Sequence, residues 1–223
     1  MSSDRPARAG TAHLVRPEND DGTGPGVLLL HSWWGLTAFV KEQCEQLADA
    51  GFVVLAPDLI GGASPETAAE AEFELGVSDP NETAALVLSS IVALRSQTDD
   101  PDAPIAVIGF SMGASWALWA ATRQPESVRA VVAYYGTQNI DFELLRAPVL
   151  GHFAEDDEIV PIDELIEMQS HLLLLEKSVV VHRYEGCHHF FAEQSPEATL
   201  EPAAAAVAWD RTIKFLNHQS SSL

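Results

Sequence analysis

Residues 104–113 read PIAVIGFSMG, which places a short apolar run directly before the pattern Gly-x-Ser-x-Gly. The run is typical of a buried strand, and the stretch that follows it, Ala114–Thr122, is suited to a helix. A serine between a strand and a helix is the arrangement of a nucleophile elbow, in which the two glycines let the strand and the helix approach each other. We therefore identify Ser111 as a candidate nucleophile.

Similar apolar runs alternate with stretches of helical period on both sides of this motif. The sequence predicts strands at Thr11–Arg16, Gly26–His31, Phe52–Ala56, Pro104–Gly109, Arg129–Tyr134, Pro148–Phe153 and Ser178–Tyr184. It predicts helices at Ala38–Ala50, Ala114–Thr122 and Pro202–Asn217, one that opens near Asn81 and Thr83, and one that starts at Pro161. This alternation favours an α/β fold with a mostly parallel central sheet and helices on both faces. The run Gly26–His31 is apolar on both faces, so we expect it inside the sheet.

The length of 223 residues fits a single domain that spans residues 1–223. Residues 60–80 form the least regular stretch, and either a partly helical lid or a solvated excursion fits them. The balance of 12 Lys and Arg against 33 Asp and Glu gives a net charge of −21. Such a negative surface repels phosphate backbones and anionic lipids, so we expect no nucleic-acid partner and no membrane partner.

The location of the protein is inferred from what the sequence lacks. The first seventeen residues, MSSDRPARAGTAHLVRP, are polar and do not resemble a secretory signal. The apolar runs are far shorter than the roughly 18 residues that a membrane span requires. We therefore expect a cytoplasmic protein.

Acidic and histidine residues follow two later strands of the predicted sheet. Asp156 and Asp157 come after the strand 148–153, and His188 and His189 come after the strand 178–184. The order serine, acid, histidine at carboxyl strand ends is that of a catalytic triad in this class of fold. The two acids, which precede Pro161, could instead cap a helix, and adjacent histidines in a loop are often surface residues. The neighbouring aromatic residues favour a pocket-lining position for the histidines.

Several separate motifs together resemble the dienelactone hydrolase family of the α/β-hydrolase superfamily, from about Gly26 to Leu216. The matching stretches are LHSWWGL at 30–36, LAPDL at 55–59, GFSMG at 109–113, DEIVP at 157–161, YEGCHHFF at 184–191 and AWDRT at 208–212. The resemblance implies an α/β-hydrolase fold and a member with a serine nucleophile at Ser111. It places the acid at Asp157, four residues before Pro161, and the base at His189, five residues after Tyr184.

An oxyanion hole should accompany this triad. We expect one donor to be the backbone N–H of Met112, the residue after the nucleophile. The resemblance places the second donor on the backbone N–H of Trp33. Further candidate pocket residues are Ser32, Trp34, Phe110 and Phe191.

These residues predict a cofactor-independent serine hydrolase that cleaves small carboxylic esters or lactones through an acyl-enzyme. The alternative is a non-catalytic small-molecule receptor or an inactive homologue on the same scaffold. We expect no metal site, because the sequence offers no ligand spacing for one. We expect the protein to be a monomer or a homodimer. Glu193 stands where dienelactone-specific members carry an arginine for the substrate carboxylate, so we expect neutral substrates to be preferred over carboxylated ones.

Overall fold

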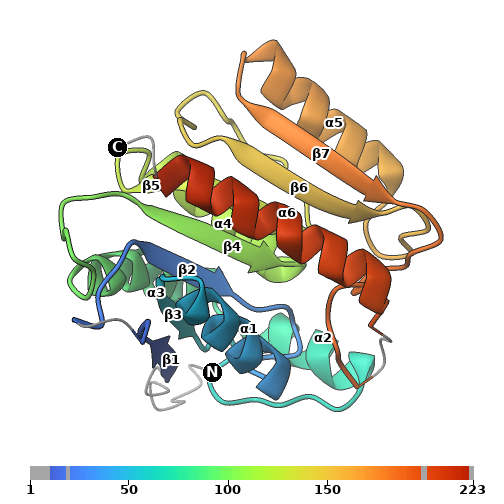
Figure 1. The fold of residues 1–223 in the computed structure, drawn as a ribbon. Coiled ribbons are helices and arrows are strands. Elements are labelled where there is room, and N and C mark those ends of the chain that lie inside the picture. The colour runs from blue at the N-terminus through green and yellow to red at the C-terminus, as the bar shows by residue number, and fades with distance from the viewer. Residues whose placement is uncertain (1–10, 19–20, 197–199, 221–223) are drawn as a thin grey trace.

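The computed structural model describes residues 11–18, 21–196 and 200–220. The first ten residues, which carry much of the stretch examined for a secretory signal, lie outside the described part of the chain, as do the last three residues of the domain expected over 1–223. The described chain folds into a layered structure around one seven-stranded sheet (Figure 1). Its strands are β1 (Ala12–Val15), β2 (Gly26–Leu30), β3 (Val53–Pro57), β4 (Ile105–Phe110), β5 (Val128–Tyr134), β6 (Val149–Ala154) and β7 (Val179–Tyr184).

The sheet is parallel except at one edge. The strand order is β1-β3-β2-β4-β5-β6-β7, and only β1 pairs antiparallel, with β3. The strand β2 lies between β3 and β4 with all five residues buried, as its apolar sequence predicts. Because the other six strands run in the same direction, the loops after β2, β4, β6 and β7 lie together at the carboxyl ends of the strands.

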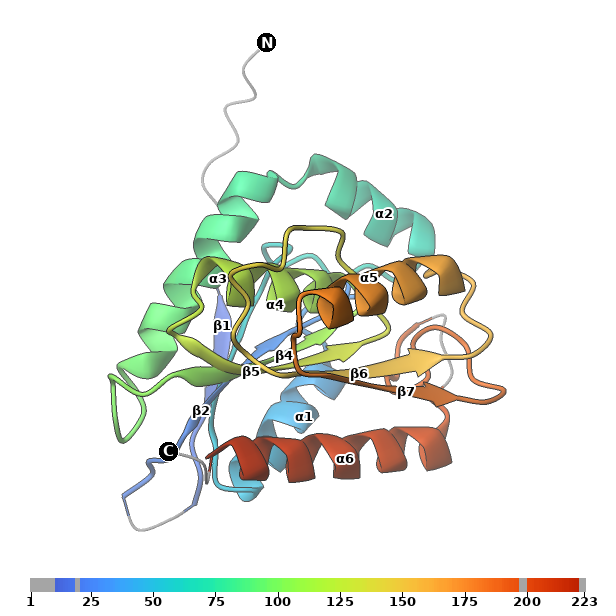
Figure 2. The same cartoon turned by 90° about the horizontal axis from the view of Figure 1, so that it is seen from above.

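Helices cover both faces of this sheet, which confirms the predicted α/β-hydrolase fold (Figure 2). The helices α1 (Ala38–Asp49) and α6 (Pro202–Ser220) lie on one face. The helices α3 (Pro80–Arg95), α4 (Met112–Arg123) and α5 (Ile162–Leu174) lie on the other. The side chains of β2 alternate between them: Val27 and Leu29 pack into the core beneath α1 and α6, whereas Leu28 and Leu30 pack into the core on the opposite face.

The predicted elements agree with the structure apart from their ends and one helix. The helix expected near Asn81 begins earlier, at Pro80, because Asp79 caps it by accepting the backbone N–H of Asn81. Pro161 is the residue before α5 rather than its first residue. Residues 68–77 of the irregular stretch form the helix α2 (Ala68–Val77), of which only Ala71 is buried. Among the described residues, no helix combines the length and the apolar character that crossing a bilayer demands.

Candidate active site

Ser111 lies in the tight turn between β4 and α4. Its backbone has φ 51° and ψ −115°, a strained conformation for a residue with a side chain, and it occupies the N-cap position of α4. The glycines on either side allow this turn. A Cβ atom on Gly109 would lie 2.2 Å from the carbonyl oxygen of Gly113, and one on Gly113 would lie 2.2 Å from that of Leu30. The geometry is that of the nucleophile elbow expected from the sequence.

A chain of hydrogen bonds connects Ser111 to an acid through a histidine. The Oγ atom of Ser111 lies 2.9 Å from Nε2 of His189, and Nδ1 of His189 lies 2.9 and 2.8 Å from the two carboxylate oxygens of Asp157. A carboxylate beside Nδ1 keeps the proton of the neutral imidazole on that nitrogen. Nε2 is then an acceptor, and the Ser111 hydroxyl donates to it.

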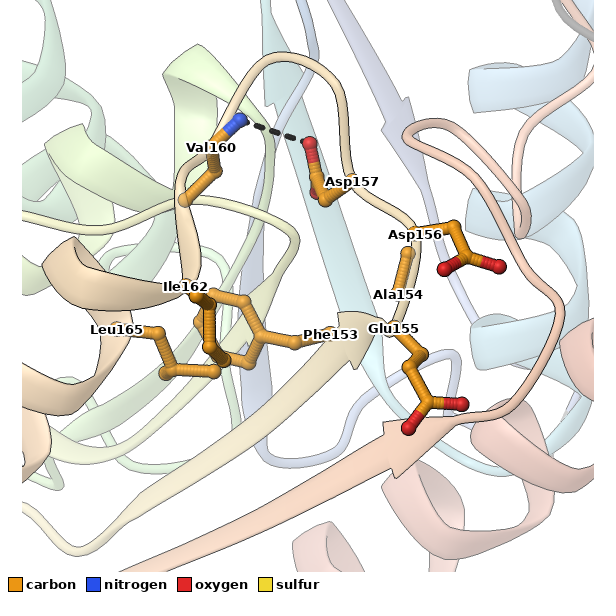
Figure 3. Close-up of a pocket in the computed structure, with 8 residues that line it drawn as sticks. All are labelled: Phe153, Ala154, Glu155, Asp156, Asp157, Val160, Ile162 and Leu165. Carbon is orange, nitrogen blue, oxygen red and sulfur yellow. Dashed lines mark hydrogen bonds between the residues drawn. The ribbon is translucent and has the colours of Figure 1, made fainter.

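Asp157 is held by its own loop. Its Oδ1 atom also accepts the backbone N–H groups of Ile159 and Val160, at 2.9 and 2.7 Å. Figure 3 shows the bond to Val160, and it shows the Asp156 side chain pointing away from that of Asp157. Both acids border a small cavity of about 120 Å³ behind this loop. Of the two acids, the structure brings only Asp157 to the histidine.

The two histidines are separated in the same way. The side chain of His189 is fully buried, and its ring packs edge-on against Phe190 with centroids 4.3 Å apart. The side chain of His188 is exposed, and its Nδ1 lies 3.0 Å from the carbonyl oxygen of Asp156 and 3.6 Å from a carboxylate oxygen of Glu158. His188 therefore lies at the surface beside the site, and it does not reach Ser111.

The two expected oxyanion donors lie on the loops after β4 and β2. Met112 is the first residue of α4, directly after Ser111, and Trp33 follows β2 by three residues. The loop that carries Trp33 is fixed on both sides of it. His31 accepts the N–H of Leu59 through Nε2 at 2.8 Å, and its Nδ1 donates to the carbonyl of Ser32 at 2.6 Å. The Ser32 hydroxyl accepts the N–H of Trp34 at 3.3 Å.

A cavity of about 440 Å³ opens beside His189. Aromatic side chains form much of its wall, and two carboxylates lie on it: Trp33, Trp34, Phe190, Phe191, Glu158 and Glu201. Ala68, at the start of α2, also borders it, so the irregular stretch 60–80 reaches the cavity. Two residues that we expected in the pocket, Phe110 and Ser32, do not line this cavity. Phe110 is 1% exposed and stacks on Tyr134 with centroids 4.6 Å apart, because its side chain points from β4 into the core beneath α1.

Ser32 and Glu193 form a buried pair beneath the β2–α1 loop. Ser32 is fully buried and donates to Oε1 of Glu193 at 2.7 Å, so it supports the loop instead of facing the cavity. Glu193 is also fully buried, which corrects the expectation that it meets the substrate. Burial raises the pKa of Glu193 to about 7, against the opposing influence of the Ser32 hydroxyl and of the nearby Tyr135 hydroxyl.

Sequence reasoning missed Tyr135, Glu158 and Glu201. Tyr135 follows β5 with φ 38°, and its ring packs 5.0 Å from that of His189. Its position after a predicted strand is a signal that could have drawn attention to it. Glu158 directly follows Asp157, whereas Glu201 comes from the segment before α6, and nothing local in the sequence indicates that it reaches the cavity.

Other reactive groups contribute little here. Cys187 is a free, buried thiol close to the site, and burial together with the neighbouring Glu201 and Asp156 raises its pKa. A raised pKa keeps the sulfur protonated and unreactive. Within the described ranges, no three His, Cys, Asp or Glu side chains are grouped so that they could hold a metal ion.

Comparison with known proteins gives the family. The model of the dienelactone hydrolase family matches residues 11–220. Protein usf of Aquifex pyrophilus is 30% identical over 201 residues, which are 86% of this chain and 87% of that protein. The carboxymethylenebutenolidase of Pseudomonas sp. strain P51 is 27% identical over 228 residues, 92% of this chain and 88% of its own. The crystal structure of the dienelactone hydrolase-like promiscuous phosphotriesterase P91, from metagenomic libraries, superposes with a TM-score of 0.80 at 22% identity and covers 95% of this chain and 99% of that one. The chain therefore belongs to the dienelactone hydrolase family.

Proposed function

We propose that this protein is a serine hydrolase that cleaves small carboxylic esters or lactones through an acyl-enzyme, without a cofactor. Membership of the dienelactone hydrolase family supports hydrolysis as the reaction class. The carboxymethylenebutenolidase and the probable lactonase of Bradyrhizobium sp., 28% identical over 227 residues, are named for cleaving lactones, which supports the substrate class.

The first half of the reaction forms the acyl-enzyme. His189 removes the proton of the Ser111 hydroxyl through Nε2, and the oxygen attacks the carbonyl carbon of the substrate. Asp157 stays ionised, holds the ring by Nδ1 and stabilises the imidazolium that forms. The N–H groups of Met112 and Trp33 donate to the oxyanion, and the N-terminus of α4 adds favourable dipole charge there. His189 then gives its proton to the departing alkoxide.

The second half releases the acid. A water molecule takes the place of the alcohol. His189 removes a proton from this water, and the resulting hydroxide attacks the acyl carbon. Collapse of the second tetrahedral intermediate returns the proton to Ser111. In a lactone the alcohol remains tethered to the acyl group, so the product is a single hydroxy acid.

One observation carries the proposal: the continuous hydrogen-bonded chain from Ser111 through His189 to Asp157. The test is labelling with a fluorophosphonate probe, together with a screen of p-nitrophenyl esters and simple lactones. Labelling and turnover that disappear in Ser111→Ala, with an unchanged circular dichroism spectrum, support the hydrolase. A Ser111→Ala variant that retains more than a tenth of the wild-type rate contradicts it. Measurable ligand binding without labelling supports a receptor.

A further inference from the structure

The cavity beside His189 is built from aromatic rings that contact one another. Trp33 stacks on Phe190 with ring centroids 5.9 Å apart and 27° between the planes, and Trp34 lies 5.9 Å from the same phenylalanine. Trp34 and Phe190 are almost fully buried, whereas Trp33 is partly exposed and lines the cavity. The faces of such rings carry partial negative charge, and they attract ammonium groups that come within about 6 Å.

The charged side chains along this cavity are acidic. Glu158 and Glu201 line it and are exposed to solvent. Its other titratable lining residues are His189, which is engaged by Asp157 and Ser111, and His188, which lies 3.6 Å from Glu158. A protonated His188 would offset one carboxylate at most. The lining therefore combines two exposed carboxylates with the partly exposed indole of Trp33.

The nearby arginine side chains already interact with other residues. Arg183 lies 3.7 Å from Glu155, and Arg211 donates to the Tyr184 hydroxyl at 3.2 Å. No lysine or arginine is among the described residues that line the cavity. A ligand cation in the cavity consequently meets no basic side chain, and the net charge of −21 attracts it from a distance.

We propose that the cavity selects small carboxylic esters that carry an ammonium group, an inference that rests on the ester-hydrolase function proposed above. Trp33 connects binding to chemistry, because its backbone N–H is the second oxyanion donor of the proposed function and its side chain borders the cavity. An ester held at Ser111 lies next to this cavity, because His189 both lines it and lies within hydrogen-bond distance of the Ser111 hydroxyl. The carboxylates of Glu158 and Glu201 add attraction at the cavity wall.

The test compares two esters of the same shape, acetylcholine and its uncharged carbon isostere 3,3-dimethylbutyl acetate. At low ionic strength we expect kcat/KM for acetylcholine to exceed that for the isostere by about tenfold or more, the effect of one cation–π contact combined with two solvent-exposed charge attractions. The ratio of the two values should fall severalfold in 1 M NaCl, because salt screens exposed charges over a few ångströms.

Variants connect the preference to the cavity. The double variant Glu158→Gln/Glu201→Gln should lower the ratio severalfold, and Trp33→Leu should lower it further. The ratio is compared, and not the rate, because a general loss of catalysis affects both esters. Glu167→Gln removes an exposed carboxylate from α5, on the far side of the sheet from α6, and should leave the ratio unchanged.

The outcomes separate this inference from the function beneath it. Equal or faster hydrolysis of the neutral isostere overturns the cation preference and leaves the esterase standing. Failure to hydrolyse either ester counts against the proposed function, and the cation site is then tested alone by calorimetric titration of Ser111→Ala with choline. Binding that weakens in the double glutamate variant sustains the site, and absence of binding overturns it.

Discussion

The hydroxyl of Ser32 donates a 2.7 Å hydrogen bond to the carboxyl of Glu193, and both side chains are fully buried. The bond ties the loop after β7, which carries His189, to the loop after β2, which carries Trp33. The Ser32 hydroxyl also accepts the backbone N–H of Trp34. The pair therefore stabilises the backbone next to Trp33, the expected oxyanion donor. A buried carboxyl in this place has consequences for stability.

Replacing Glu193 by Gln is expected to stabilise the protein above neutral pH. The pKa of Glu193 is about 7 in the folded protein, raised by burial from an ordinary value of 4.5. Between these values the folded protein keeps a proton that the unfolded chain loses, so this group lowers the free energy of unfolding as pH rises from 4.5 to about 7, and no further above that. A gap of 2.5 pKa units corresponds to about 3 kcal/mol.

Urea unfolding of both proteins from pH 5.5 to 8.5 measures this difference. Gln keeps an acceptor for the Ser32 hydroxyl and cannot ionise, so its advantage should grow with pH and level off above neutrality. The exposed Glu185 supplies the control, since Glu185→Gln makes the same chemical change at a side chain that is not buried. A pH-independent effect of Glu193→Gln would contradict the assigned pKa.

Asp157→Asn is expected to reduce kcat by several orders of magnitude, because an amide facing Nδ1 of His189 no longer holds the required tautomer. The corresponding change in the best-studied serine protease costs about 10⁴ in kcat. Asp156→Asn is the matched control, because its carboxylate points away from Asp157 and its backbone makes the local contacts. Steady-state kinetics with a p-nitrophenyl ester gives both values, and equal losses would show that the acid is assigned to the wrong register.

His189→Gln is expected to abolish turnover, whereas His188→Gln should leave most of it. Of the two histidines, His189 is the one within hydrogen-bond distance of the Ser111 hydroxyl, and removing the base of a triad costs on the order of 10⁶ in kcat in a well-studied case. Fluorophosphonate labelling rates should follow the same order, since the serine loses its base in only one variant. Comparable labelling of the two variants would place the base elsewhere.

The parts of the site that sequence predicts best are those defined by one continuous segment. The elbow at Ser111 is a strand, a turn and a helix in immediate succession, so its local pattern is enough to place it. Phe110 illustrates the limit one residue away. Its side chain direction depends on how β4 is oriented in the sheet, and that orientation sends it to Tyr134 in the core.

Features that depend on distant segments were harder to predict. Glu193 and Ser32 are separated by 161 positions, and their pairing follows from how two loops pack, so the sequence offered only the unusual acid itself. The helix α2 buries only Ala71, and its Glu-rich and Ala-rich sequence carries no clear apolar stripe to identify it. The cap of α3 was missed because several capping residues, including Ser78 and Asp79, stand close together.

A lactone that carries a free carboxylate is expected to be a poorer substrate than the same lactone with a primary amide in its place. The physical reason differs from the one that the sequence suggests, because Glu193 is fully buried and does not line the cavity. Repulsion comes instead from Glu158 and Glu201 on the cavity wall, with no lysine or arginine among the described lining residues to pair the substrate charge. We expect kcat/KM for the amide to exceed that for the acid severalfold at low salt, and this difference to narrow in 1 M NaCl as the exposed carboxylates are screened.

The Glu158→Gln/Glu201→Gln variant should narrow the difference in kcat/KM as well, with Glu167→Gln as the control. A preference for the free acid at both salt concentrations would mean that a basic group reaches the bound substrate, and the acidic wall would then not govern selectivity.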